Sequence, residues 1–399
     1  MTIDATTVAR VPALGVLTEE MLERFASRAP GYDAENRFFH EDLADLKEAG
    51  YLLLTTPVPR GGLGATLVQA CAEQRRLARY APATALGLCM HLYWTGVAGE
   101  LERAGDRSLG WLLDEAAAGE VFAVGRGERG SDLPLVAPTT RAERVEGGYR
   151  FTGHKIFGSM SPAWTRLGIE GLDEADSRGP QVVHAFLPRD ASGYSIVETW
   201  DALGMRPTRS DDTLLEGAFV PDRYIARVVP AGWSGMDPFV LGAKAWGETL
   251  IAAVYLGIAE RAFELAVAGC KRRTSIALDG RSYAYHPMVQ YAVAEMAMEL
   301  QAAVAIHERV AEDWSAGVAH GDAWAARLAA ARHRGASGAM RVVDLALEVS
   351  GGGGVLKGNE LERLYRDVRC AGFHPPNAAL THELVGKTAL GVLGEQPRW

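Results

Sequence analysis

The sequence predicts a mostly α-helical fold with a central β-barrel, and three observations carry that prediction. Runs with apolar residues at helical spacing fill the first third of the chain. Short segments rich in aromatic and β-branched residues follow, separated by glycine, proline and aspartate. Long alanine- and leucine-rich amphipathic runs then return. We therefore expect an N-terminal helical domain, a β-barrel domain and a C-terminal four-helix bundle at residues 1–120, 121–230 and 231–399.

The N-terminal helices are predicted from periodicity and from their stop signals. The run EDLADLKEAGYLLL has apolar residues at helical spacing and a glycine stop at Gly50. TLVQACAEQRRLARYAP is expected to end at Pro82, and SLGWLLDEAAAGE near Gly119. Prolines and glycines between residues 57 and 64 indicate a loop between helices.

The middle of the chain is predicted to form several short antiparallel strands. The strand-like runs are GGYRFTGHKIFGS, QVVHAFLP, GYSIVETW and DTLLEGAFVP. Their turn residues and short lengths are typical of a barrel or a sandwich.

The last part of the chain is predicted to be a bundle of long helices. Its longest apolar stretch, residues 239–268, contains five charged residues, which argue against a membrane span and for a buried helix. Three further runs, beginning at Met288, Ala323 and Asn359, show the same helical spacing of apolar residues. Four helices with short connections favour an antiparallel bundle.

Composition excludes several other classes of protein. The chain has 399 residues and a formal net charge of −9 without a basic block, which argues against a nucleic-acid surface. Its four cysteines are far apart and form no Cys-x-x-Cys pair, so we expect neither a disulfide framework nor a metal site. The N-terminal segment shows no signal-peptide pattern, and we expect a cytoplasmic protein.

Four local motifs occur along the chain in this order: GERGSDLP, GHKIFGSMSP, LGMRPTRSDDTLLEGAFVP and EVSGGGGVLKGNELERLYRDVR. Together with the predicted order of helices, barrel strands and helices, they resemble the acyl-CoA dehydrogenase superfamily of FAD flavoenzymes, from about Leu17 to Gly391. The resemblance implies FAD held between the barrel and the bundle. It also implies a homotetramer built as a dimer of dimers.

The resemblance implies two phosphate-binding features. In the family a glycine loop from the neighbouring subunit meets the ADP part of FAD, and Gly351, Gly352, Gly353 and Gly354 match it. Without side chains, their N–H groups can approach a pyrophosphate, although a plain helix–helix turn is the alternative. Family members also place an arginine on the pyrophosphate, and Arg272, with its neighbour Arg273, stands at the matching place. The alternative is a solvated basic helix end.

The resemblance also implies a flavin-side strand and turn. Phe157, Gly158 and Ser159 match the strand beside the isoalloxazine ring, with Ser159 as the hydroxyl near the flavin. Gly130, Ser131 and Asp132 match a turn that lines the flavin and the acyl channel; Lys155 and Ser161 accompany the strand. Where the family often reads Thr-Glu, this chain has Gly125-Arg126, a departure from an ordinary CoA channel.

The position of the catalytic base departs from the family pattern. Most members supply a glutamate in the loop after an Arg-Asp helix, but the corresponding residue is Pro375, and residues 368–382 contain no Asp or Glu. Some relatives carry the glutamate on the first bundle helix, where Glu248 lies one position from the expected site, Gly247. A one-residue shift turns a helix by about 100°, so an ion-pair partner is the alternative role for Glu248.

His374 offers a different precedent. Flavin-dependent monooxygenases of the same fold have a histidine at this distance from the Arg-Asp pair, a serine on the flavin-side strand and a histidine in the helical domain. His374, Ser159 and His91 fit that sketch. The alternatives are a satisfied core histidine for His91 and a helix-ending cap for His374.

Three functions follow from these residues; we expect the first, which the overall resemblance favours, and hold the second as the alternative, which the missing glutamate favours. The first is a FAD dehydrogenase that oxidises an acyl thioester, bound to CoA or a carrier protein, at the α,β carbons, with an electron-transfer partner. The second is a monooxygenase that uses FAD or FMN, oxygen and a separate flavin reductase. The third is a flavin-binding or assembly protein without turnover, which the full set of flavin-side residues disfavours.

Overall fold

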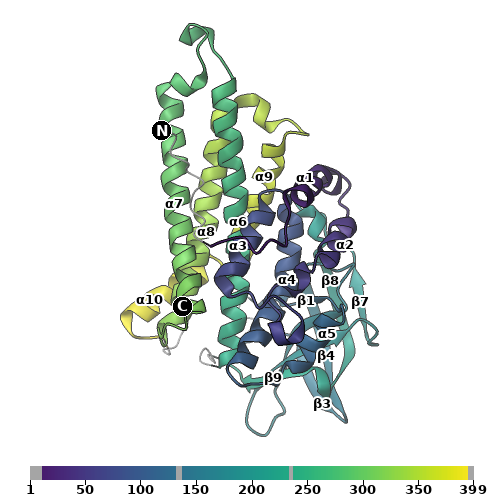
Figure 1. The fold of residues 1–399 in the computed structure, drawn as a ribbon. Helices are drawn as coiled ribbons and strands as arrows, with labels where there is room; N and C mark the ends of the chain where they lie inside the picture. Colours follow the sequence, from purple (N-terminus) through teal and green to yellow (C-terminus); the bar gives the residue numbers. More distant parts are fainter. Residues whose placement is uncertain (1–10, 132–136, 233–236, 394–399) are drawn as a thin grey trace.

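Helices from the two ends of the chain pack against each other, and the strands lie to one side of them (Figure 1). The computed structural model describes residues 11–131, 137–232 and 237–393. Helices α3 and α4 of the N-terminal part contact α6 of the C-terminal part, so one hydrophobic core runs through both helical blocks. The predicted order of helices, strands and helices is confirmed.

The N-terminal part contains five α-helices and two short 3-10 helices among the described residues. They are α1 (Glu19–Ala34), α2 (His40–Glu48), η1 (Tyr51–Leu53), η2 (Val58–Arg60), α3 (Leu67–Ala78), α4 (Pro82–Arg103) and α5 (Gly110–Ala117). The predicted end of a helix at Pro82 is wrong: α3 ends at Ala78, and Pro82 is the first residue of α4. A proline suits that position because the first helical N–H has no partner within the helix.

The central strands form one sheet with mostly antiparallel pairing. They are β1 (Phe122–Val124), β2 (Gly127–Glu128), β3 (Arg141–Val145), β4 (Gly148–Gly158), β5 (Arg166–Asp173), β6 (Gln181–Pro188), β7 (Tyr194–Val197), β8 (Asp211–Pro221) and β9 (Ile225–Pro230). The order is β7-β8-β4-β3-β5-β6-β9, while β1 pairs in parallel with β5 and β2 pairs with β4. Over the described residues β7 and β9 do not pair, so the expected barrel is open, although β6 and β8 approach each other.

The C-terminal part contains the long helices. They are α6 (Pro238–Arg272), α7 (Pro287–Ser315), α8 (Ala323–Ser350), α9 (Glu360–Arg369) and α10 (Ala378–Leu390). The intervening 3-10 helices are η5 (Ile276–Leu278), η6 (Tyr283–Tyr285), η7 (Gly351–Val355) and η8 (Cys370–Phe373), while η3 (Arg206–Thr208) and η4 (Asp222–Tyr224) flank β8. Across the part of the chain that the structure describes, we find no helix that is long and apolar enough to cross a membrane.

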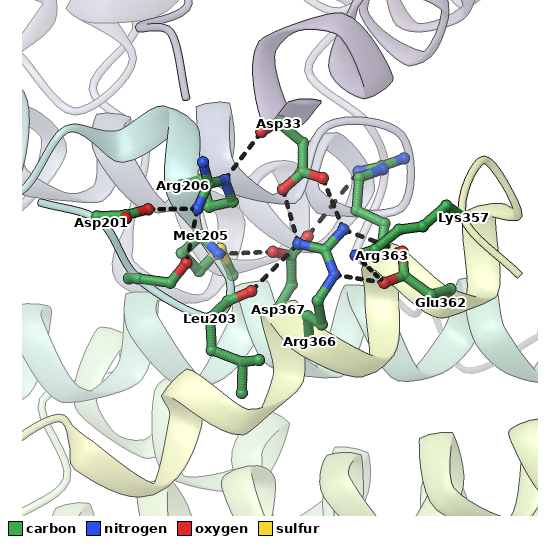
Figure 2. A network of polar contacts seen from close by, with 11 residues as sticks. Asp33, Asp201, Leu203, Met205, Arg206, Lys357, Glu362, Arg363, Arg366 and Asp367 are labelled. Carbon is green, nitrogen blue, oxygen red and sulfur yellow. Dashed lines mark hydrogen bonds and ion pairs between the residues drawn. The ribbon is translucent and has the colours of Figure 1, made fainter. Parts of the chain in front are cut away.

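A buried ion-pair network joins α9 to the other two parts of the molecule (Figure 2). Arg366 of α9 donates to both carboxylate oxygens of Asp33 in α1, at 3.0 and 2.6 Å, and to the backbone oxygen of Leu203, at 3.1 Å. Next to it, Asp367 accepts from the backbone N–H of Met205 at 2.6 Å. The segment before η3 is therefore held against the end of α9, where the expected active-site loop begins.

Candidate active site

The loop between α9 and α10 presents His374. Helix α9 ends at Arg369, η8 continues to Phe373, and Asn377 caps α10 by accepting from the backbone N–H of Leu380 at 3.0 Å. Pro375 and Pro376 lie between these elements and cannot continue a helix. The short connection leaves His374 half-buried between two fixed helix ends.

His374 is held by one side chain from α6 and one from α8. Its Nε2 lies 2.7 Å from the Tyr255 hydroxyl, and the two rings are 5.6 Å apart. The Arg332 guanidinium donates to the backbone oxygens of Ala371 at 2.8 Å and of His374 at 2.5 Å. Burial, with a contribution from the charge of Arg332, lowers the pKa of His374 to about 3, so its ring is neutral at pH 7.

Glu248 lies on α6, two turns before Tyr255. Its side chain is buried, one carboxylate oxygen pairs with Lys244, and Oε2 has no hydrogen-bond partner among the described residues. Burial raises the pKa of Glu248, while Lys244, Arg332 and Arg126 oppose the rise. The charge of Arg332 favours the ionised form of Glu248 and the neutral form of His374, the two predicted catalytic groups.

At the end of β4 the ring of Phe157 is exposed and Ser159 is buried. Phe157 has a φ of 59° and a side chain that is 64% exposed, and its ring meets Trp200 edge-on. Gly158 is buried. The Ser159 hydroxyl lies 2.8 Å from that of Ser210 and is itself buried. Ser159 is therefore engaged inside the protein, and its role beside a flavin stays a prediction.

His91 is enclosed in the core between η1 and β1. Its Nε2 lies 2.9 Å from the backbone oxygen of Leu52, and its Nδ1 accepts from the backbone N–H of Phe122 at 3.2 Å. Burial lowers its pKa to about 4. Both nitrogens are occupied, which is the arrangement of a satisfied core histidine. Its catalytic role stays a prediction that this geometry does not favour.

A buried ion cluster surrounds the side chain of Lys155 in β4. The Lys155 ammonium pairs with Glu128 and donates to the backbone oxygen of Glu170 at 2.7 Å. Arg126 donates to the Glu170 carboxylate at 2.7 Å and to the Tyr93 hydroxyl at 2.6 Å. Lys155 is thus part of the core, where it pairs with Glu128. Arg126, which replaces the glutamate of the family pattern, pairs with Glu170.

The predicted turn after β2 is only partly described. Gly130 has a φ of +80°, a conformation that favours glycine. The Ser131 hydroxyl donates to the backbone oxygen of Ala137 at 3.1 Å. Asp132 lies outside the described residues.

Arg273, the neighbour of the predicted Arg272, lies beside the predicted glycine loop at the end of α8. Arg273 donates to the last carbonyls of that helix, those of Val349 and Ser350, at 3.0 and 2.6 Å. Gly351 follows with a φ of +67°; side chains at Gly352 and Gly353 would meet nothing within 4 Å. Arg272, by contrast, is exposed and has no ion-pair or hydrogen-bond partner within the described ranges.

These residues fit a flavin. The exposed ring of Phe157 suits an isoalloxazine. The open backbone at Gly352 and Gly353 and the free guanidinium of Arg272 suit a pyrophosphate. Sequence reasoning missed Tyr255 and Arg332. The available signal for Arg332 was a charged residue within an alanine- and glycine-rich stretch, a composition typical of close helix packing.

Comparisons with known proteins show the family to which the chain belongs. Residues 249–377 match the family model "Acyl-CoA dehydrogenase, C-terminal domain". The chain is 30% identical over 370 residues to "Putative acyl-CoA dehydrogenase YdbM" of Bacillus subtilis (strain 168), covering 92% of this chain and 93% of that relative. It is also 30% identical over 403 residues to amino sugar nitrososynthase DnmZ of Streptomyces peucetius, covering 93% and 92%.

The fold is similar to that of a solved flavin complex. KijD3 bound to FMN and dTDP-3-amino-2,3,6-trideoxy-4-keto-3-methyl-D-glucose superposes with a TM-score of 0.82 at 24% identity, covering 94% of this chain and 92% of KijD3. The fold and the similar proteins identify a flavin-dependent oxidoreductase. The chain belongs to the acyl-CoA dehydrogenase superfamily, whose named relatives here include both a dehydrogenase and a nitrososynthase.

Proposed function

We propose that this protein is a flavin-dependent monooxygenase that transfers one oxygen atom to a nitrogen of a small amine. The observation that carries the proposal is the loop after α9. It holds a neutral histidine, His374, and no carboxylate between residues 368 and 382, where most acyl-CoA dehydrogenases supply their glutamate base. A ring with a pKa of about 3 is a poor base for the α-proton of a thioester.

The amine as substrate is supported by two further points. Glu248 has an unpartnered, buried carboxylate oxygen, which can accept an N–H from a substrate. A 30% identical relative is named as an amino sugar nitrososynthase. Arg126 in place of the family's glutamate also argues against an ordinary CoA channel.

The reaction inserts one oxygen atom of O2 into a new N–O bond and releases the other as water, consuming two electrons and two protons. A flavin reduced by a separate reductase supplies the two electrons when bound. The chain's own groups bind and orient: Glu248 accepts the proton that the nitrogen gives up, and His374 donates a hydrogen bond without bringing a charge. Phe157 would lie along the flavin ring, and Arg272 would hold the phosphate.

The test supplies the protein with FMN or FAD, an NADH-driven flavin reductase and 18O2. A panel of small amines, including nucleotide-linked amino sugars, is followed by mass spectrometry. We expect 18O in the amine product, in an amount that falls in the His374→Gln variant. Absence of 18O in every amine, together with anaerobic bleaching of the flavin by an acyl-CoA, would show that the proposal is wrong.

A second candidate is dehydrogenation of an acyl thioester, with Glu248 as the base that takes the α-proton. The observation in its favour is the raised pKa of this buried carboxyl, together with its free oxygen. Under this alternative, acyl-CoA substrates reduce the flavin anaerobically, and Glu248→Gln abolishes that reduction. A Glu248→Gln protein that still bleaches at the wild-type rate would remove Glu248 as the base.

We also propose that the chain assembles into a homotetramer. Helix α7 exposes Met288, Tyr291 and Met298, whose spacing places them on one face, and this exposed apolar surface supports self-association. Sedimentation equilibrium measures the mass of the assembly directly. The flavin itself, FAD or FMN, is identified by releasing it from the purified protein and determining its mass.

A further inference from the structure

The Tyr255 hydroxyl and the His374 ring form an isolated pair. Tyr255 is buried in α6, and its hydroxyl lies 2.7 Å from Nε2 of His374. Among the described residues neither the hydroxyl nor the other ring nitrogen, Nδ1, has any further hydrogen-bond partner. One proton must therefore lie between the two atoms, and the question is which atom carries it.

The tyrosine is the donor. Burial raises the pKa of Tyr255 well above its ordinary value, so the phenol keeps its proton. If Nε2 of His374 carried the proton instead, it would donate to the phenol oxygen, and the buried phenol O–H would have no acceptor among the described residues, at a cost of about 1–3 kcal/mol. When the phenol donates, Nε2 accepts, and a neutral ring must then carry its proton on Nδ1.

The neighbouring charges keep the ring neutral. Arg332 of α8 donates to the backbone oxygens of Ala371 and His374, which places its positive charge beside the ring. The charge of Asp367 in α9 raises the pKa of Tyr255, while the Cys370 thiol of η8, whose pKa burial raises to about 12, carries no charge near pH 7. Burial and Arg332 both disfavour the imidazolium, so the ring does not gain a second proton near pH 7.

We propose that Tyr255 and Arg332 are positioning residues that fix His374 as a neutral hydrogen-bond donor with its proton on Nδ1. The substrate-side role of that donor rests on the proposed function, but its tautomeric state does not. His374 then gives a hydrogen bond to an oxygen or nitrogen acceptor and cannot take a proton through Nε2. Tyr255 determines which ring nitrogen of His374 carries the proton, although it does not itself touch the reacting atoms.

The test reads the tautomer directly, without turnover. Protein labelled with 15N-histidine is compared with His374→Gln to assign the His374 ring signals. We expect a neutral ring protonated on Nδ1 from pH 5 to pH 9 in the wild type, and in Tyr255→Phe a second population protonated on Nε2. Tyr285→Phe, at an exposed tyrosine of η6, should leave the spectrum unchanged. An Nε2-protonated ring in the wild type, or no change in Tyr255→Phe, overturns the proposal.

The kinetic arm separates this inference from the proposed function. With whichever substrate is turned over, Tyr255→Phe should lower kcat roughly tenfold with little change in KM, as expected for one misdirected hydrogen bond. If the spectra are as expected but no amine is oxygenated, the proposed reaction is refuted and the positioning role of Tyr255 is not. Unchanged kcat in Tyr255→Phe, with the expected spectra, would show that the donor is not used.

Discussion

The buried ring of His91 gives a pH test of the core beside the site. Its native pKa is about 4, below the ordinary value of 6.5, because burial disfavours the charged form. As pH falls from 7 to 5, the unfolded chain gains a proton on this residue that the native chain does not. The free energy of unfolding should therefore drop by about 2 kcal/mol on account of His91 alone.

The sign follows from which state binds the proton. Because the native pKa is depressed, the stabilising contribution of the neutral ring is complete above pH 6.5 and is lost as pH falls toward 4. His307 and His374 also have lowered pKa values, but they contribute equally to the wild type and to a His91 variant. The comparison with His91→Gln therefore isolates the one ring.

Urea unfolding followed by tryptophan fluorescence measures the effect. At pH 7, His91→Gln should be less stable by about 1–3 kcal/mol, because a glutamine cannot satisfy both backbone partners at once. At pH 5 that gap should shrink by about 2 kcal/mol, and between pH 7 and pH 8 it should stay constant. A gap that does not change between pH 7 and pH 5 would refute the reasoning and return His91 to the flavin-side candidates.

Three further substitutions test the junction, the core and the cofactor site. Arg366→Ala leaves Asp33 buried without its partner, and the urea midpoint should report a loss of about 3–5 kcal/mol; a loss below about 1 kcal/mol would mean that the network is solvated. Gly168→Ala would place a Cβ 2.5 Å from the Trp94 ring and should cost about 1–3 kcal/mol; an unchanged melting temperature would contradict this packing. Phe157→Ala removes an exposed ring, so stability should change by less than about 0.5 kcal/mol, while flavin Kd, measured by fluorescence titration, should rise roughly tenfold; an unchanged Kd would exclude contact with the flavin.

The order of helices and strands could be predicted because most elements bury one face and expose the other. Helix α9 is the clearest example, with charged residues on one side and Leu361, Leu364 and Val368 on the other. Helix α4 shows the limit. Nearly all of its residues are buried, so its sequence carries no polar face, and periodicity alone cannot show that Pro82 begins the helix rather than ends the preceding one.

The candidate site was predictable only where a residue type carries its own constraint. The glycines at 351–354 and the absence of Asp and Glu from residues 368–382 are visible in a single sequence. The partners of His374 are not, because Tyr255 and Arg332 lie 119 and 42 positions away along the chain and meet it only through helix packing. Ser159 illustrates the same point, since its hydroxyl is turned toward Ser210 by tertiary structure.

Arg332 binds the loop after α9 through two backbone carbonyl oxygens and forms no hydrogen bond with the side chains of that loop. Because every amino acid has a backbone carbonyl, these hydrogen bonds do not depend on which residue occupies position 374. The backbone of the loop is therefore held independently of its side chains, and a substitution at position 374 should change the chemistry of the group that the loop presents while Arg332 keeps its two hydrogen bonds.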